Sequence, residues 1–209
     1  MALKTVSFSA AAGLLKNPQS SQRRSAAKRL RKLRDPRAGP ALLTALKKEL
    51  QDPRTWETQY QMIMALGESN YREALPFLQE LAGRSFEATM VYVAIGDAIV
   101  RLGRIAEHDA GPVIELMRSG NSMLADGAFR AMAMLRIKPD PRPIHVIIDF
   151  VSSFPREDPL RFWVAAAAPG WKEPKVESFL RECSTSARND LREAAVDALA
   201  GKYRAWKSL

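Results

Sequence analysis

The fold is decided by residues 24–43, which read RSAAKRLRKLRDPRAGPALL. Ala26, Ala27 and Leu30 follow the spacing of one apolar helix face, and Asp-Pro and Gly-Pro steps come after them. Proline fits the first turn of a helix, because the N–H that it lacks would have no partner there. The stretch therefore predicts two consecutive helices, the second of which opens near Pro40.

The same arrangement returns along the chain. Comparable segments open at prolines that stand 36, 36, 31 and 31 residues apart: Pro40, Pro76, Pro112, Pro143 and Pro174. Leu30, Leu66 and Leu102 stand ten residues before the first three of these prolines, near the end of an apolar helical pattern. A period of this length, with two helices in each unit, is typical of an α-solenoid.

Residues 24–43 resemble a HEAT repeat, and are closest to the short bacterial variety called the phycobilisome-lyase-type HEAT-like repeat. Residues 191–201 resemble the first helix of such a repeat. The resemblance implies a right-handed superhelix of antiparallel helix pairs, with the first helices on the convex side and the second helices on the concave side. It implies no single activity, because fold does not decide function.

We expect an all-α, right-handed α-solenoid of about five antiparallel helix pairs, with a leading helix near residues 7–16. The chain is expected to form one HEAT-like repeat domain, residues 1–209. The predicted parts are repeats at about 20–51, 52–83, 84–120, 121–155 and 156–185, and a closing helix at 189–203. Residues 144–154 are rich in β-formers but do not alternate strictly, so a helix is expected there too.

The positive charge is concentrated at one end. The chain carries a net charge of +9, and its first 50 residues hold twelve basic and two acidic residues. With the apolar face turned inward, the cations of residues 23–48 are expected outside, where an acidic protein surface or the phosphates of a nucleic acid could bind. The predicted residues are Arg23, Arg24, Lys28, Arg31, Lys32, Lys47 and Lys48. A solubilising cap on the terminal repeat explains the polarity equally well, although not its sign.

Nucleic-acid binding through this region would be non-specific. Between Lys16 and Lys48 there is no Phe, Tyr or Trp, so bases would have no aromatic ring to stack on. HEAT-like alkylpurine DNA glycosylases use an aspartate beside tryptophans in a basic groove, and no such motif can be matched in this chain residue by residue.

The favoured function is a non-enzymatic scaffold or adaptor that binds a protein partner, with no cofactor. Its partner would meet the concave side through residues of the second helices: Leu43, Gln79, Glu115, Arg118, Asp149, Glu177 and Arg181. Two alternatives are a phosphate-backbone binder related to the repair glycosylases and a regulatory or immunity-type inhibitor.

Asp97 interrupts an apolar stretch, so its carboxylate should have a partner. Corresponding positions of the repeats would stack as a polar ladder of first helices: Gln61, Asp97, Arg130 and Arg161. In this ladder Asp97 would bridge to Arg130, and the local alternative is Arg101, one helical turn further on.

Catalytic and metal motifs are missing. The chain has two histidines, His108 and His145, without a His-Glu dipeptide of the kind that binds di-iron in some HEAT-like enzymes, and without any metal-binding helix motif. We therefore expect no enzyme activity and no metal. One cysteine, Cys183, fits a reducing compartment, and no apolar run reaches the ~20 residues of a membrane span. The expected location is the cytoplasm.

Overall fold

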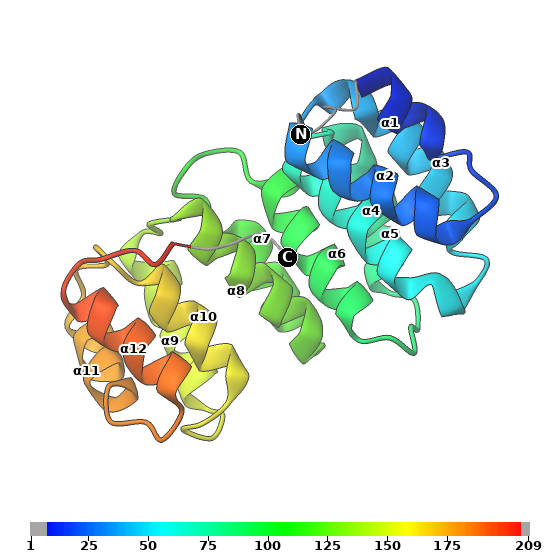
Figure 1. The fold of residues 1–209 in the computed structure, drawn as a ribbon. Helices are drawn as coiled ribbons and strands as arrows, with labels where there is room; N and C mark the ends of the chain where they lie inside the picture. Colours follow the sequence, from blue (N-terminus) through cyan, green and yellow to red (C-terminus); the bar gives the residue numbers. More distant parts are fainter. Residues whose placement is uncertain (1–7, 206–209) are drawn as a thin grey trace, which may run out of the picture. The chain divides into compact units, whose positions relative to one another are not determined.

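The computed structural model of the chain describes residues 8–205. Twelve α-helices and three short 3₁₀ turns occupy this range, and no strand occurs within it. The helices separate into two compact units, and the boundary lies between Gly103 and Arg104. The expectation of an all-helical repeat fold is confirmed (Figure 1).

Unit 1 consists of three successive helix pairs. Its helices are α1 (Phe8–Leu14), α2 (Ser20–Leu33), α3 (Gly39–Glu49), α4 (Trp56–Glu68), α5 (Leu75–Ala82) and α6 (Met90–Gly103). The long helices α2, α4 and α6 lie side by side, while α1 packs on α2, α3 on α4 and α5 on α6 (Figure 1). The 3₁₀ turns are η1 (Pro36–Ala38), η2 (Pro53–Thr55) and η3 (Arg72–Ala74).

Unit 2 repeats this plan. Its helices are α7 (Gly111–Arg118), α8 (Ser122–Leu135), α9 (Pro141–Ser152), α10 (Pro159–Ala167), α11 (Pro174–Cys183) and α12 (Asn189–Leu199). Here α8, α10 and α12 lie side by side, with α7 packed on α8, α9 on α10 and α11 on α12. The β-prone stretch 144–154 falls mainly in α9, so the expected helix is confirmed there.

The proline and leucine phases mark the structure as predicted. Pro76 and Pro112 stand second in α5 and α7, and Pro174 stands first in α11. Leu30 and Leu66 are fully buried. Burial of these repeated apolar positions joins each long helix to its neighbours. This packing stabilises the helices, since an isolated helix of this length is only marginally stable in water.

Asp-Pro steps begin several helical segments. Asp35, Asp52 and Asp158 each accept a hydrogen bond from the backbone N–H two residues further on, at 2.9, 3.1 and 2.9 Å. Asp140 precedes α9 in an extended conformation without such a side-chain bond. A side-chain cap is therefore present at three of the four Asp-Pro steps.

The leading and closing helices lie close to their expected positions. Helix α1 covers Phe8–Leu14, and Ser7 of the expected range lies outside the described residues. Helix α12 ends at Leu199, four residues before the expected end. The unit boundary falls inside the predicted third repeat, 84–120, and a single domain over 1–209 stays a prediction. Among the described residues, every helix is too short or too polar to cross a bilayer.

Candidate functional site

Two arginines of the predicted basic region turn inward from α2. Arg31 is 3% exposed, and its Nε donates to Glu68 Oε1 at 2.7 Å while its Nη1 donates to Gln61 Oε1 at 3.2 Å. Arg23 binds both oxygens of Glu49, at 2.5 and 2.9 Å. The expectation that Arg31 lies on the outward arc is wrong, because that side of α2 faces α4, which supplies Glu68.

Glu49 is the acidic counterpart within the basic region. Its side chain is 1% exposed, and Ser20 Oγ donates to its Oε1 at 2.5 Å. Burial by itself would raise the pKa of Glu49, but hydrogen bonds from Arg23, Ser20 and Thr55 outweigh it, so this pKa is lowered. Arg23 and Glu49 therefore form a structural ion pair that joins α2 to the end of α3.

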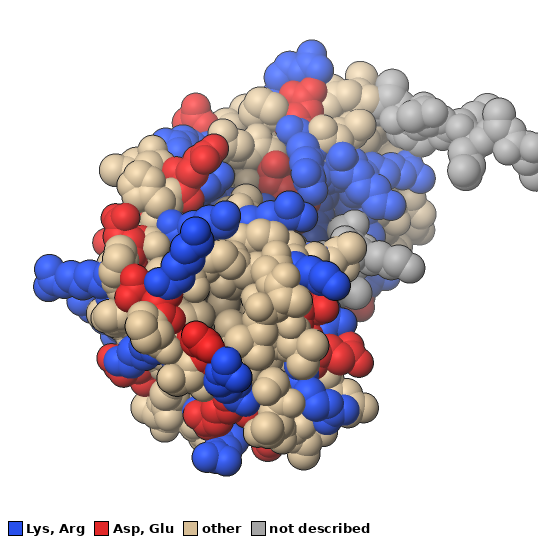
Figure 2. Space-filling view, turned by 90° about the vertical axis from the view of Figure 1, so that its left-hand side faces the viewer, with Lys and Arg blue, Asp and Glu red and all other residues tan. Residues whose placement is uncertain are grey.

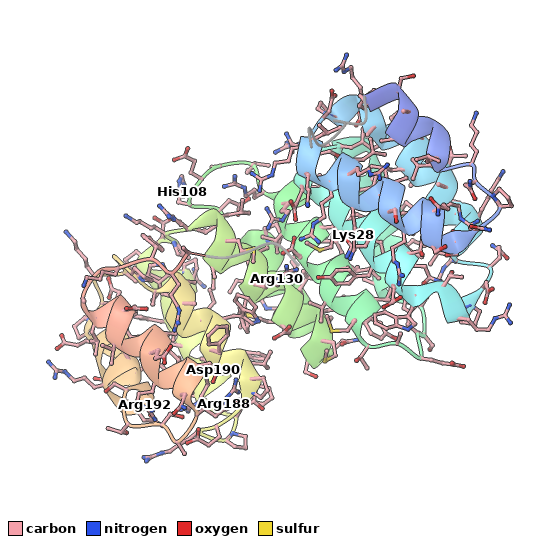
Figure 3. All side chains as sticks on the ribbon, viewed as in Figure 1. Lys28, His108, Arg130, Arg188, Asp190 and Arg192 are labelled. Atoms are coloured by element: carbon pink, nitrogen blue, oxygen red, sulfur yellow. The ribbon has the colours of Figure 1, made fainter. Side chains whose placement is uncertain are left out.

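Three cations of α2 remain exposed and define what we call the α2 basic face: Lys28, Arg29 and Lys32. Their positions on the helix fall within an arc of about 100°. Within residues 8–205 no carboxylate lies at ion-pairing distance from any of them. Figure 3 labels Lys28 on α2. Arg24 differs, because it forms an ion pair with Glu57 of α4.

Two more predicted cations lie on α3. Lys47 and Lys48 are both exposed, and Lys47 Nζ lies 5.1 Å from the centre of the Phe77 ring. Such a cation–π contact holds the ammonium group on unit 1 without neutralising it. The seven predicted binding cations therefore fall into two groups. Three arginines form ion pairs within unit 1: Arg23, Arg24 and Arg31. Four lysines are exposed: Lys28, Lys32, Lys47 and Lys48.

The residues predicted on the second helices are mostly exposed. Leu43 is half-buried, and the other six lie at the surface of α5, α7, α9 and α11: Gln79, Glu115, Arg118, Asp149, Glu177 and Arg181. Lys175 binds Asp149 at 2.5 Å, and Arg181 binds Glu177 at 2.6 Å. Charges on the second helices of unit 2 are thus compensated locally. On the face shown in Figure 2, acidic and basic side chains likewise lie side by side over much of the surface.

The predicted polar ladder consists of buried residues. Gln61, Asp97, Arg130 and Arg161 are 6, 0, 5 and 3% exposed. Asp97 forms an ion pair with Arg101, which is the local alternative considered above. Arg161 donates to Glu182 at 2.9 Å, which links α10 to α11. Because Asp97 belongs to unit 1 and Arg130 to unit 2, the bridge between them stays a prediction.

Two features of unit 2, a buried acid and a pocket, are not predicted by the sequence. Burial raises the pKa of Asp126 on α8 to about 6, with Arg130 one turn away acting in the other direction. A pocket of about 450 Å³ in unit 2 is lined by residues far apart in the sequence: Glu107, His108, Arg136, Lys138 and Tyr203. No local sequence motif predicts a pocket of this kind.

Metal-ligating side chains do not cluster within residues 8–205. No group of three or more His, Cys, Asp or Glu side chains in this range could hold a metal ion. Cys183 is 1% exposed, and burial raises the pKa of its thiol to about 11. A thiol of this kind is protonated near neutral pH and unreactive.

Comparison with known proteins identifies the repeat type. Residues 22–48 match the family model of the PBS lyase HEAT-like repeat, so the chain contains a repeat of this family where the sequence resembled one. A search of curated protein sequences finds no match.

The chain also resembles the solved structure of human deoxyhypusine hydroxylase in complex with glycerol. The two are 17% identical with a TM-score of 0.41, and the match covers 93% of this chain and 83% of the other. The expectation that the chain is not an enzyme is corrected here, because a protein with a similar fold is an enzyme. At this similarity the match concerns the fold alone and assigns no reaction to the chain.

Proposed function

We propose that this chain is a helical repeat scaffold that binds an acidic surface of a partner protein through the α2 basic face. One observation carries the proposal: Lys28, Arg29 and Lys32 project from a rigid helix without carboxylate partners in the described range, whereas neighbouring arginines are paired. Unpaired like charges on one helix face repel each other, and an acidic partner relieves this repulsion.

A protein partner is favoured over nucleic acid by the composition of unit 1 around this face. Residues between Lys16 and Lys48 include no aromatic ring on which a base could stack. The second helices of unit 2 are weaker candidates for charge-driven binding, because Asp149 and Glu177 already form ion pairs with Lys175 and Arg181. The proposed location is the cytoplasm, since the buried thiol of Cys183 fits a reducing compartment.

The experiment compares two triple variants with the same change in net charge. The test variant carries Lys28→Gln, Arg29→Gln and Lys32→Gln. The control carries Arg37→Gln, Arg54→Gln and Arg84→Gln, which removes three exposed but ion-paired cations of unit 1. Each protein is immobilised and used to capture partners from nuclease-treated extract of the source cell.

We expect the wild type and the control to retain a common acidic partner that the test variant loses. Equal retention by both variants would overturn the proposal. If retention is instead seen only from extract that was not treated with nuclease, nucleic acid is the ligand. The affinity for duplex DNA should then fall with salt, with a slope of about −3 in log K against log salt for three phosphate contacts.

A further inference from the structure

The pocket in unit 2 combines two cations, an imidazole and an aromatic ring. Its volume is about 450 Å³, within the range of roughly 300–1,000 Å³ that is usual for small-molecule sites. Glu107 and His108 come from the loop before α7, as Figure 3 shows for His108, and Arg136 and Lys138 from the turn between α8 and α9. Tyr203 follows α12 and closes the set.

Arg136 is held in place without losing its charge. It caps the end of α8 in a left-handed conformation with φ of 54°, and its guanidinium carbon lies 4.7 Å from the centre of the Tyr203 ring. The Tyr203 hydroxyl in turn donates to the Pro169 carbonyl oxygen at 2.6 Å. No carboxylate of residues 8–205 forms an ion pair with Arg136, so its donors remain available to a ligand.

The side chain of Lys138 lies against Gly170, which has no side chain to crowd it. Gly170 adopts a φ of +84°, and a Cβ atom there would lie 3.2 Å from both Cε and Nζ of Lys138. Lys138, like Arg136, has no carboxylate at ion-pairing distance in the described part of the chain. Two permanent positive charges therefore line the pocket beside a single acid, Glu107, and one further nitrogen donor, His108.

We propose that this pocket binds a phosphomonoester dianion. A guanidinium group presents a planar fork of N–H donors to phosphate oxygens, and a lysine adds a point charge. Separated cations and the imidazole nitrogen fit the three oxygens of a phosphate better than the two of a carboxylate. The volume leaves room for the group that carries the phosphate, which is either a small metabolite or a phosphorylated side chain of a peptide.

The test uses the full chain and phenyl phosphate, titrated by calorimetry at constant ionic strength. Two charge-assisted contacts correspond to a dissociation constant of roughly 1 mM. Arg136→Gln and Lys138→Gln should each weaken binding about tenfold. Arg156→Gln, in the loop after α9, removes the same charge from unit 2 and should leave binding unchanged.

The outcomes separate the proposal from simple charge attraction. Absence of binding at about ten times the expected constant, or equal weakening by Arg156→Gln, would overturn the site. Equal affinity for phenyl sulfate, a monoanion of similar shape, would overturn the preference for a dianion. A phosphoserine peptide that binds about tenfold tighter than phenyl phosphate identifies a partner protein as the source, and equal affinities identify a free phosphomonoester.

Tyr203 acts as a positioning residue for Arg136, and two variants test this role. Tyr203→Phe keeps the ring under Arg136 and should retain most of the affinity, while Tyr203→Ala should lose several-fold. An unchanged affinity in Tyr203→Ala would contradict the positioning role. The α2 basic face belongs to unit 1, so the triple variant of Lys28, Arg29 and Lys32 should bind phenyl phosphate normally, and failure of either proposal leaves the other standing.

Discussion

Replacement of Glu49 by glutamine tests whether the basic region is partly structural. The carboxylate is buried and accepts hydrogen bonds from Arg23 at 2.5 and 2.9 Å and from Ser20 at 2.5 Å. Glutamine keeps the shape but not the charge, and its NH₂ group would face the donors of Arg23. We therefore expect unit 1 to lose stability.

The size of the loss follows from the surroundings of Arg23. Removing one partner of a fully buried ion pair costs about 3–5 kcal/mol. The Arg23 side chain is 21% exposed and keeps bonds of 2.8 Å to the carbonyl oxygens of Asn17 and Pro18, so part of its charge stays solvated or paired. We therefore expect a loss of about 2–3 kcal/mol, at or just below the lower end of this range.

The loss should depend on pH. Because the folded-state pKa of Glu49 is lowered from its ordinary value of 4.5, the carboxylate stabilises the fold above that value. This contribution disappears as the pH falls through the lower, folded-state pKa. The difference between the wild type and Glu49→Gln should therefore be constant near neutral pH and shrink in acid below 4.5.

Urea unfolding followed by far-ultraviolet circular dichroism measures the difference. The matched control is Glu80→Gln, which breaks an exposed pair with Arg84 in the same unit and should cost less than about 1 kcal/mol. If Glu49→Gln costs no more than this control, or if its cost does not change in acid, the structural role of the Arg23–Glu49 pair is refuted.

Three further predictions concern the cores of the two units. Phe129→Ala should destabilise unit 2 by about 3–5 kcal/mol in urea unfolding, because the ring is fully buried, and a much smaller loss would contradict that burial. Gly67→Ala should destabilise unit 1 by about 1 kcal/mol or more despite the better helix propensity of alanine, since the new Cβ would lie 2.9 Å from the Ala98 Cα atom; a gain in stability would show that α4 and α6 can separate easily. Cys183 should react with iodoacetamide far more slowly in the native chain than in urea, as its thiol is buried with a pKa of about 11, and equal rates measured by mass spectrometry would refute this.

The helical repeat could be predicted because the buried apolar residues recur at a regular spacing in the sequence. Leu30, Leu66 and Leu102 recur at a fixed distance and are all buried. Gly67 shows the limit of local rules, since glycine is typical of positions just after a helix end. Helix α4 continues through it to Glu68, and the missing side chain serves the close approach of Ala98 instead.

The inward turn of Arg23 and Arg31 was harder to predict, since their partners lie in other helices. Glu49 and Glu68 are 26 and 37 residues away along the chain. One signal was present: Glu49 is one of only two acids among the first 50 residues. The pocket in unit 2 offered no such signal, because its residues come from three segments that are separated along the chain by two and by four helices.

The contacts of Tyr203 bear on where the chain can be shortened after α12. A protein trimmed after Gly201 would keep all twelve helices that residues 8–205 form. It would nevertheless lose the ring that lies against Arg136 and the hydroxyl that bonds Pro169. Helical content is therefore no safe criterion for an acceptable C-terminal truncation, and ligand titration is the appropriate quality check.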